Sequence, residues 1–324
     1  MAINSSVEQR VVVTGASGLI GSSVVRALTA RQIHVIKLVR KMTGAPGVEG
    51  EEILWNPEPG KTDDSLPSLN ELDAAIHLSG ANVAAHRWSE EYKREILRSR
   101  VDTTRALCRL LVRMERIPSV LVCASAIGIY GDRGDELVDE RSATGSGFLA
   151  ETCKAWEEAT REAEDAGIRV VHLRFGVVLV PGGGALGKLL PLFKMGLGGR
   201  IASGRQWMSW VTLEDVVAAV LRVLGRDVSG AGGTAELDEV ELSGAVNVTS
   251  PSPVTNAEFT RVLGRVLGRP ALMAVPAFAL RLAVGEMADE ALLAGCRAVP
   301  AKLVEAGFHF QDPVLEPALR KLLH

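Results

Sequence analysis

Short apolar runs alternate with longer amphipathic segments through the first half of the chain. Runs rich in β-branched residues predict strands, whereas apolar residues that recur every three or four positions predict helices. The predicted strands are residues 11–13, 34–39, 52–55, 73–78, 119–125 and 168–173, and the predicted helices are residues 19–31, 89–116 and 148–165. This alternation is typical of an α/β fold, a doubly wound parallel sheet covered by helices on both faces.

The second half of the chain differs in composition and in its pattern of predicted elements. Glycine is frequent over residues 182–204, a helix is predicted at 213–224, and prolines separate short helical segments at 256–267, 276–284, 288–297 and after Pro313. We therefore predict two domains. Residues 1–181 form the sheet domain, to which the chain returns within residues 206–250, and residues 182–324 form a smaller, mostly helical C-terminal domain on the substrate side.

Charge and composition disfavour several classes of function. The 324 residues carry 36 Lys and Arg against 39 Asp and Glu, and this net charge of −3 gives no basic field that would indicate nucleic acid or a membrane surface. No uncharged apolar run reaches the roughly 18 residues of a membrane helix, and no apolar signal core is present, so we expect a cytoplasmic protein. Widely spaced cysteines favour reduced core thiols, and without a HExxH or GxSxG motif neither a metal site nor a serine hydrolase is predicted.

Three glycines follow the first predicted strand at intervals of three residues. Gly15 is suited to the tight turn, Gly18 to close approach of the backbone to a pyrophosphate, and Gly21 to close packing of helix on strand. The helix that begins here offers free N–H groups and the positive end of its dipole to an anion. Strand, glycine turn, helix and second strand together predict a Rossmann-type dinucleotide site.

The residue that ends the second strand indicates which dinucleotide is bound. NAD sites usually present a carboxylate there to the ribose hydroxyls, whereas a basic residue accommodates the 2′-phosphate of NADP. This chain has Val39-Arg40-Lys41 and no carboxylate. Arg40 therefore favours NADP(H), the alternative being a solvated arginine at the end of a strand.

Several motifs make the sequence similar to a known family. They are TGASGLIG (14–21), SAIGIYG (125–131), GFLAETCKAWEEA (147–159), LRFGVVLVPGGG (173–184) and SGRQWMSWVTLEDV (203–216). With these motifs the chain resembles the atypical, extended short-chain dehydrogenase/reductases, and within them an epimerase-like family of NADP-binding oxidoreductases that is sometimes labelled cell-division inhibitor. The resemblance extends over about residues 11–323.

The resemblance also implies which residues hold the cofactor. It places Gly15, Ser17, Gly18, Leu19 and Ile20 on a pyrophosphate loop after the first strand, and Arg40 at the 2′-phosphate after the second strand. It places Leu78, Ser79 and Gly80 beside the adenosine after the fourth strand. Glu95 and Arg100 of the long helix lie near the cofactor by the same resemblance, and Val178 lies near the nicotinamide.

The catalytic pair of the superfamily is missing. Its YxxxK motif uses a tyrosine as acid and base and a lysine that lowers the tyrosine pKa. Aligned on this sequence, the two positions hold Leu149 and Cys153, neither of which can perform that chemistry. Lys154 lies one residue further, about 100° around the helix. The usual serine position holds Ala126.

Other residues are candidates to replace the lost pair. Ser125 and Tyr130 follow the central strand, where parallel sheets form their sites, although a turn hydroxyl and a packed wall residue are the structural alternatives. Gln206, Trp207 and Trp210 bring two indoles into one short loop and are candidates to bind a substrate, although core packing explains indoles equally well.

We thus expect an NADP(H)-binding oxidoreductase that acts on an unidentified small molecule without the Tyr/Lys pair. Two alternatives stay open. One is a non-catalytic redox sensor that responds to NADP(H), and the other is an epimerase or dehydratase of a nucleotide-linked sugar. Beyond the substrate, the expected partners include no nucleic acid and no membrane, and a homodimer is left open.

Overall fold

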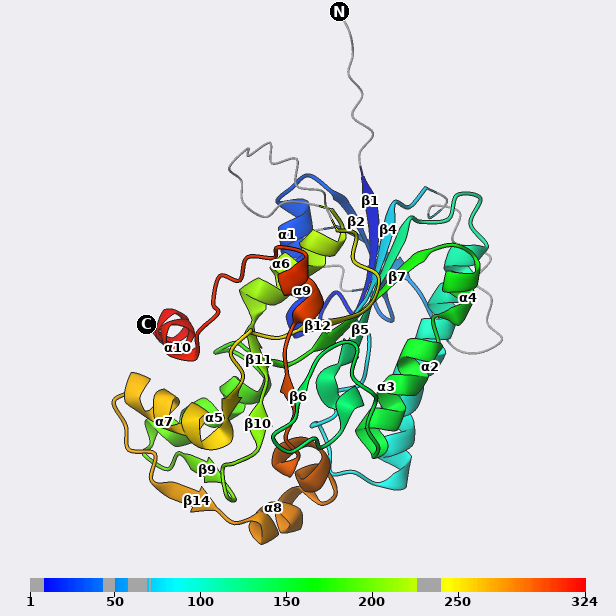
Figure 1. Cartoon of the computed structure of the whole chain (residues 1–324). Helices are drawn as coiled ribbons and strands as arrows, with labels where there is room; N and C mark the ends of the chain where they lie inside the picture. The colour runs from blue at the N-terminus through cyan, green and yellow to red at the C-terminus, as the bar shows by residue number, and fades with distance from the viewer. Residues whose placement is uncertain (1–8, 43–49, 58–68, 70, 226–239) are drawn as a thin grey trace, which may run out of the picture.

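A seven-stranded parallel sheet forms the centre of the molecule (Figure 1). The computed structural model describes residues 9–42, 50–57, 69, 71–225 and 240–324. The strand order is β12-β7-β5-β4-β1-β2-β3, so the chain crosses over after β3 and continues on the other side of β1. These strands are β1 (Arg10–Thr14), β2 (His34–Val39), β3 (Glu51–Leu54), β4 (Ala74–His77), β5 (Val120–Ala126), β7 (Arg169–Phe175) and β12 (Gly244–Val248). The predicted Rossmann-type α/β fold is confirmed.

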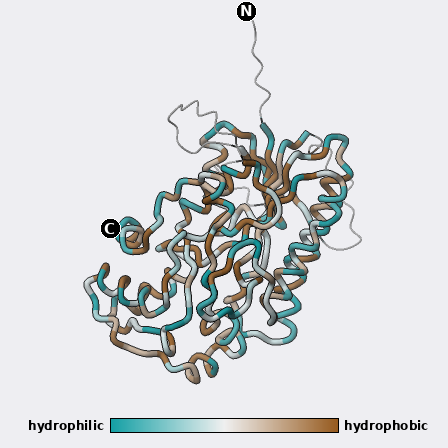
Figure 2. The backbone as a smooth tube through the Cα atoms, viewed as in Figure 1, coloured by the Kyte–Doolittle hydropathy of each residue, from teal (hydrophilic) through white to brown (hydrophobic). Residues whose placement is uncertain are grey.

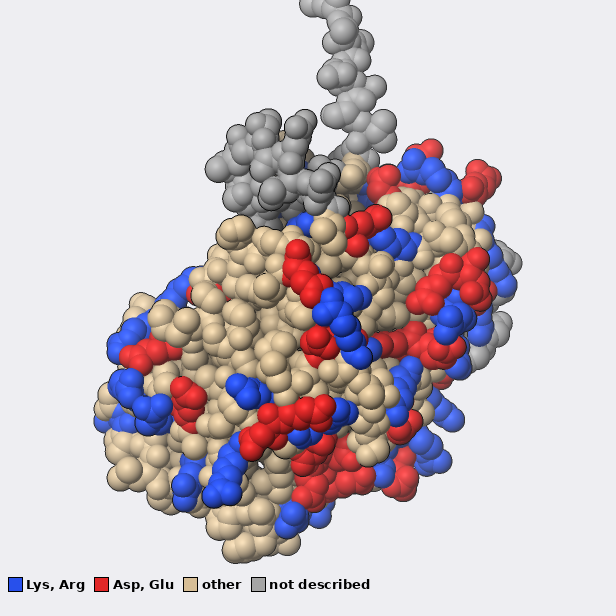
Figure 3. Space-filling view, in the orientation of Figure 1, with Lys and Arg blue, Asp and Glu red and all other residues tan. Residues whose placement is uncertain are grey.

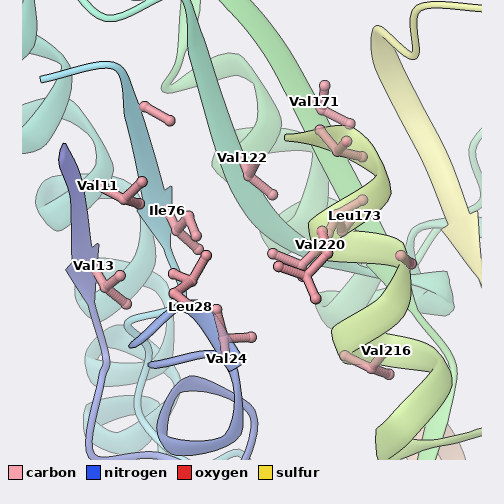
Figure 4. Close-up of a cluster of buried hydrophobic side chains, with 14 of the residues drawn as sticks. Val11, Val13, Val24, Leu28, Ile76, Val122, Val171, Leu173, Val216 and Val220 are labelled. Carbon is pink, nitrogen blue, oxygen red and sulfur yellow. The ribbon is translucent and has the colours of Figure 1, made fainter. Parts of the chain in front are cut away.

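Helices cover both faces of the sheet because side chains alternate along each strand. Val11 and Val13 of β1 pack with α1 (Leu19–Thr29) and α6 (Leu213–Val223), and Figure 4 shows this cluster. Val12 points to the opposite face, where it packs with α2 (Glu90–Val112) and α4 (Arg161–Asp165). The hydropathy of the backbone in Figure 2 is accordingly most apolar along the central strands.

The remaining elements lie mainly at the carboxyl edge of the sheet. The helices among them are α3 (Phe148–Glu158), α5 (Gly184–Lys194), α7 (Asn256–Val266), α8 (Ala277–Val284), α9 (Ala301–Glu305) and α10 (Leu315–Leu323), with a 3₁₀ helix η2 (Ile127–Tyr130) and a π-helix η3 (Ala288–Leu293). The short strands are β6 (Leu137–Val138), β8 (Val177–Leu179), β9 (Gly199–Ile201), β10 (Trp207–Met208), β11 (Trp210–Thr212), β13 (Val254–Thr255), β14 (Met273–Val275) and β15 (Arg297–Ala298). A separate apolar cluster joins α5, α7 and α10.

Two predicted helices differ from the structure. The helix predicted over 148–165 is divided into α3 and α4, because the Thr160 hydroxyl donates to the Glu157 carbonyl (2.7 Å) and contacts the His172 ring (2.9 Å), which tightens the turn. The helix predicted over 288–297 ends at Leu293. There Gly295 passes so close to residue 207 that a Cβ on it would lie 2.9 Å from the Trp207 nitrogen. The chain therefore extends into β15, which pairs with β6.

The four cysteines lie in the interior of the protein. Cys108, Cys123, Cys153 and Cys296 are all free and buried, as predicted. Within the described part of the chain, no helix combines the length and the apolar content needed to cross a membrane.

Candidate functional site

The three glycines form a turn that a larger residue could not make. Gly15 has a φ of +69°, and a Cβ on it would lie 2.6 Å from the Leu78 backbone. A Cβ on Gly21 would lie only 2.1 Å from the Gly15 carbonyl oxygen, so the first turn of α1 packs directly against the loop. Gly18 caps α1 without a side-chain hydrogen bond, and no acidic residue lies in the first turn. The N-terminus of α1 is therefore open to an anion.

Residues from three distant segments meet around this turn. Ile20, Leu78 and Val178 pack against the same apolar cluster. The side chain of Leu19 reaches Gly183, where a Cβ would lie 3.1 Å from it. Ser17 and Gly80 are exposed, and Ser79 is half-buried. The glycine loop, the end of β4 and β8 thus lie at one edge of the sheet, which is the arrangement that a dinucleotide bound across this edge requires.

His77 anchors the end of β4 beneath the glycine turn. Its Nδ1 lies 2.7 Å from the Thr14 hydroxyl of β1, and its ring is fully buried. Burial lowers the pKa of His77 to about 4, so the ring is neutral at physiological pH. The pair joins the ends of the two strands from which the glycine turn and the loop after β4 start.

Arg40 lies next to the glycine turn but outside the core. The register of β1 and β2 pairs Thr14 with Leu38, so Arg40 follows at the same edge as Gly15. Its side chain is exposed, whereas the preceding basic residue of β2, Lys37, is buried and paired with Glu52 (3.3 Å). Arg40 is thus available at the position expected for a 2′-phosphate contact.

The long helix α2 carries the other two expected cofactor residues. Arg100 donates to the Ala81 carbonyl (3.0 Å) and stacks over the Trp156 ring at 5.0 Å from its centroid. Its guanidinium also borders Gly80, and burial lowers its pKa from the usual value. Glu95 is exposed on the same helix. The structure therefore places Arg100 directly against the loop that follows β4.

The helix that would carry the catalytic pair has an apolar face instead. Leu149 is half-buried and packs against an apolar cluster that includes Trp88. Cys153 is 5% exposed and lies among apolar residues. Burial raises the pKa of the Cys153 thiol to about 11, so it is not a thiolate at neutral pH. Lys154 points elsewhere and pairs with Glu151 (2.8 Å). None of these three residues supplies the acid, the base or the charge of the missing pair.

Ser125 and Tyr130 belong to one buried polar network. The Ser125 hydroxyl donates to Glu157 (2.7 Å), and Glu157 accepts two hydrogen bonds of 2.8 Å from Arg174. Arg174 also donates to the Tyr130 hydroxyl (2.9 Å), which itself donates to Asn247 (2.8 Å). Tyr130 is 0% exposed and Ser125 is 2% exposed. Both hydroxyls are thus occupied inside the protein.

Charge balance explains why this network stays ionised. Burial alone would raise the pKa of Glu157, but the hydrogen bonds and charge of Arg174, helped by Ser125, hold it below its usual value. Glu157 in turn raises the pKa of Arg174 against the effect of burial. This pair could not be predicted from the sequence, because Glu157 lies on α3 and Arg174 on β7, and only the tertiary fold brings them together.

The three candidate substrate residues have different surroundings in the structure. Trp210 is 0% exposed in the core near α7, with its indole N–H bonded to the Ser252 carbonyl (3.0 Å), so core packing explains it. Trp207 is half-buried, donates to Asp135 (2.8 Å) and stacks with Arg297 at 4.3 Å. Gln206 lines a hollow of about 400 Å³ together with residues of η3 and α8. We therefore retain Gln206 and Trp207 as candidates and leave Trp210 out.

A carboxylate that the sequence analysis missed connects η3 of the C-terminal region to the N-terminus of α3. Glu290 of η3 accepts hydrogen bonds from the backbone N–H groups of Phe148 (3.1 Å) and Leu149 (3.2 Å). These are the first N–H groups of α3, which have no partner within the helix. The C-terminal region therefore caps the helix that carries the altered catalytic positions.

Comparison with known proteins agrees with this geometry. The sequence model of the "NAD dependent epimerase/dehydratase family" matches residues 11–236, which include the glycine turn and α3. The chain belongs to this family. A second family model, a "Domain of unknown function", matches residues 275–322.

Relatives in this family span the whole chain. An epimerase family protein of Mycobacterium bovis, Mb2239, is 44% identical over 95% of this chain and 96% of its own length. The human epimerase family protein SDR39U1 is 32% identical over 97% and 99%. The crystal structure of human SDR39U1 (isoform 2) with NADPH superposes with a TM-score of 0.82 at 30% identity, covering 97% of this chain and 99% of that chain. The predicted atypical short-chain dehydrogenase/reductase family is thus confirmed.

Proposed function

We propose that this protein is an NADP(H)-binding oxidoreductase of the epimerase/dehydratase family. The observation that carries the proposal is the uncapped N-terminus of α1 with Arg40 exposed beside it and no carboxylate at the end of β2. A bound pyrophosphate would accept hydrogen bonds from the first turn of α1, and a 2′-phosphate would pair with Arg40. The human relative whose structure contains NADPH supports the same choice of cofactor.

Different residues of the chain would bind different parts of the cofactor and the substrate. The bound cofactor would supply hydride transfer. The loop of Gly15, Ser17 and Gly18 would hold its phosphates, Arg100 and the loop after β4 would border the adenosine side, and Val178 would line the nicotinamide end. Gln206 and Trp207 remain the candidates for contact with a small substrate. Buried, reduced thiols are consistent with the cytoplasm as the place of this reaction.

A non-catalytic redox sensor is the second candidate function. The two positions of the usual catalytic pair hold Leu149, which has no titratable group, and Cys153, whose thiol stays protonated near neutral pH. Ser125 and Tyr130 would have to leave the Glu157–Arg174 network before either could donate a proton to a substrate. This occupied network favours the sensor over an epimerase or dehydratase of a nucleotide-linked sugar, whose chemistry also needs an acid and base.

Calorimetric titration of NADPH and NADH tests the cofactor proposal. A charge-assisted phosphate contact is worth about 1.5–3 kcal/mol, so NADPH should bind about 10- to 150-fold more tightly. Arg40→Ala should remove most of that preference and leave NADH affinity unchanged. The matched control Arg113→Ala, an exposed arginine at the far end of α2, should keep the preference. Equal affinities for the two cofactors in the unaltered protein would refute the assignment.

A carbonyl-substrate screen with NADPH separates the enzyme from the sensor. Turnover that follows Michaelis kinetics would support an oxidoreductase. Binding of NADPH without any turnover, together with a protein partner whose affinity differs between the NADP- and NADPH-bound states, would support the sensor.

A further inference from the structure

An apolar surface lies on the C-terminal side of the molecule, away from the glycine turn. We name it the β14–α8 surface. Its large exposed side chains come from the end of α5 and the loop after it, from β14 with the residue before it, and from α8. They are Leu192, Met195, Leu197, Leu272, Met273, Val275, Phe278 and Leu282. Figure 3 shows an uncharged tip where Figure 1 places α8, with Lys and Arg side chains beside it toward β14.

The segments that carry these side chains are joined in sequence and by strand pairing. β14 pairs with β9 along its length, and Pro276 leads from β14 directly into α8. Gly196, between Met195 and Leu197, approaches the Pro270 ring, so a Cβ there would lie 4.0 Å from it. Along α8, Phe278 and Leu282 are four residues apart and share one face of the helix.

The degree of exposure is high for residues of this kind. Leu272 is 90% exposed, Leu282 75% and Phe278 71%, and α8 has no buried residue. Amphipathic helices in folded proteins bury their apolar stripe, and large contiguous apolar patches mark interaction sites. The described part of the chain leaves this stripe uncovered.

The backbone of β14 is also unpaired on one side. β14 and β9 form a two-stranded parallel sheet, in which the Ala202 N–H donates to the Val275 carbonyl (2.8 Å). In a parallel ladder the bonded residues alternate, so Met273 and Val275 bond to β9 and the N–H and C=O of Ala274 face outward. An apolar edge with free backbone groups is a template for another strand.

We propose that the β14–α8 surface is the contact between two copies of this chain. At roughly 200 Å² for a large apolar side chain, the exposed fractions of the eight residues correspond to about 980 Å², which exceeds the ~800 Å² per partner of a stable interface. Two β14 edges that meet across a two-fold axis would pair the free backbone groups of Ala274 and bring the two α8 helices together. A lipid surface would bury the same side chains but leave these backbone groups without partners.

Charge at the rim of the surface predicts how the dimer responds to salt. Lys194, Arg200 and Arg269 are exposed at its border, and none of them forms an ion pair with another described residue. All three carry a positive charge, so a contact between two copies brings like charges together at the interface, and screening by salt should strengthen the dimer. Binding to an anionic surface would weaken under the same change.

Analytical ultracentrifugation of the full chain tests the proposal. The unaltered protein should be dimeric at micromolar concentration, and raising NaCl should lower the dimer Kd. The double variant Leu272→Ser/Phe278→Ser should raise that Kd at least about 100-fold. Because both side chains are exposed, its circular dichroism and NADPH affinity should remain unchanged.

Two further variants test whether the dimer contact uses the edge of β14 and whether an exposed leucine elsewhere matters. Ala274→Pro removes only an outward N–H of the edge strand and should weaken the dimer without loss of fold. The matched control Leu137→Ser changes a leucine that is 55% exposed on β6, outside the surface, and should leave the dimer intact. A protein that is monomeric up to about 100 µM, or a dimer that the double variant does not affect, would overturn the proposal. Binding of the unaltered monomer to phosphatidylglycerol vesicles, lost in the double variant, would overturn it in favour of a membrane surface.

Discussion

Replacing Glu157 by glutamine would remove the negative charge from the centre of the buried network while keeping its shape. The Glu157 side chain is 14% exposed, and that of its partner Arg174 is 8% exposed. The variant leaves the Arg174 guanidinium without its counter-ion and turns one acceptor into an N–H₂ group that faces it. Breaking one partner of a buried pair costs about 3–5 kcal/mol, and the partial exposure of Glu157 favours the lower figure. That is a large part of the 5–15 kcal/mol typical of folded domains.

Urea unfolding at pH 7, followed by circular dichroism, measures this cost. The matched control is Glu158→Gln, since Glu158 is the next residue and pairs with Arg161 on the surface (3.1 Å), so its loss should change stability little. The pKa of Glu157 is lower in the folded than in the unfolded state, so its stabilisation is complete above the unfolded value near 4.3 and is lost as pH falls through the folded value. The difference between unaltered protein and Glu157→Gln should therefore shrink in acid. A Glu157→Gln variant as stable at pH 7 as Glu158→Gln would refute the reasoning.

Two further predictions concern the sheet edge. Gly21→Ala should abolish NADPH binding in a titration, because its Cβ would lie 2.1 Å from the Gly15 carbonyl, whereas Gly182→Ala, with no atom within 4 Å, should bind normally. His77, whose folded pKa of about 4 is below the usual 6.5, should make the protein lose up to about 3 kcal/mol of stability as pH falls from 6.5 to 4. Unfolding of His77→Gln should show a smaller loss over that range, and an equal loss would contradict the assignment.

Local patterns were enough to predict the sheet and the glycine turn at the start of α1. The strand at 34–39 and the start of α1 at Leu19 match the structure, because a β-branched run and a glycine turn act on neighbouring residues. The helix predicted from residue 89 likewise begins as expected, because the Ser89 hydroxyl accepts the Tyr92 N–H (3.1 Å) at the N-terminus of α2. Such features depend on a few consecutive residues and can be recognised in the sequence.

Contacts between distant residues could not be predicted in the same way. Tyr130 and Asn247 are 117 residues apart, and nothing near either residue indicates the other. Trp207 and Trp210 are three residues apart but lie in two different strands, β10 and β11, and packing near α7 buries the Trp210 indole while that of Trp207 stays half-exposed. The π-helix η3 has the composition of an ordinary helix, and only the close passage of Gly295 by residue 207 explains why it stops.

The contact of Glu290 with α3 bears on how this family can be divided into parts. The two family models separate the chain between residues 236 and 275, yet the second segment supplies the N-terminal cap of α3, the β15 partner of β6, and Leu303 to the main core. Residues 275–322 thus contribute a helix cap, a strand partner and a core side chain to the segment that the first model matches. Substitutions at these contacts should therefore affect the fold on both sides of the boundary.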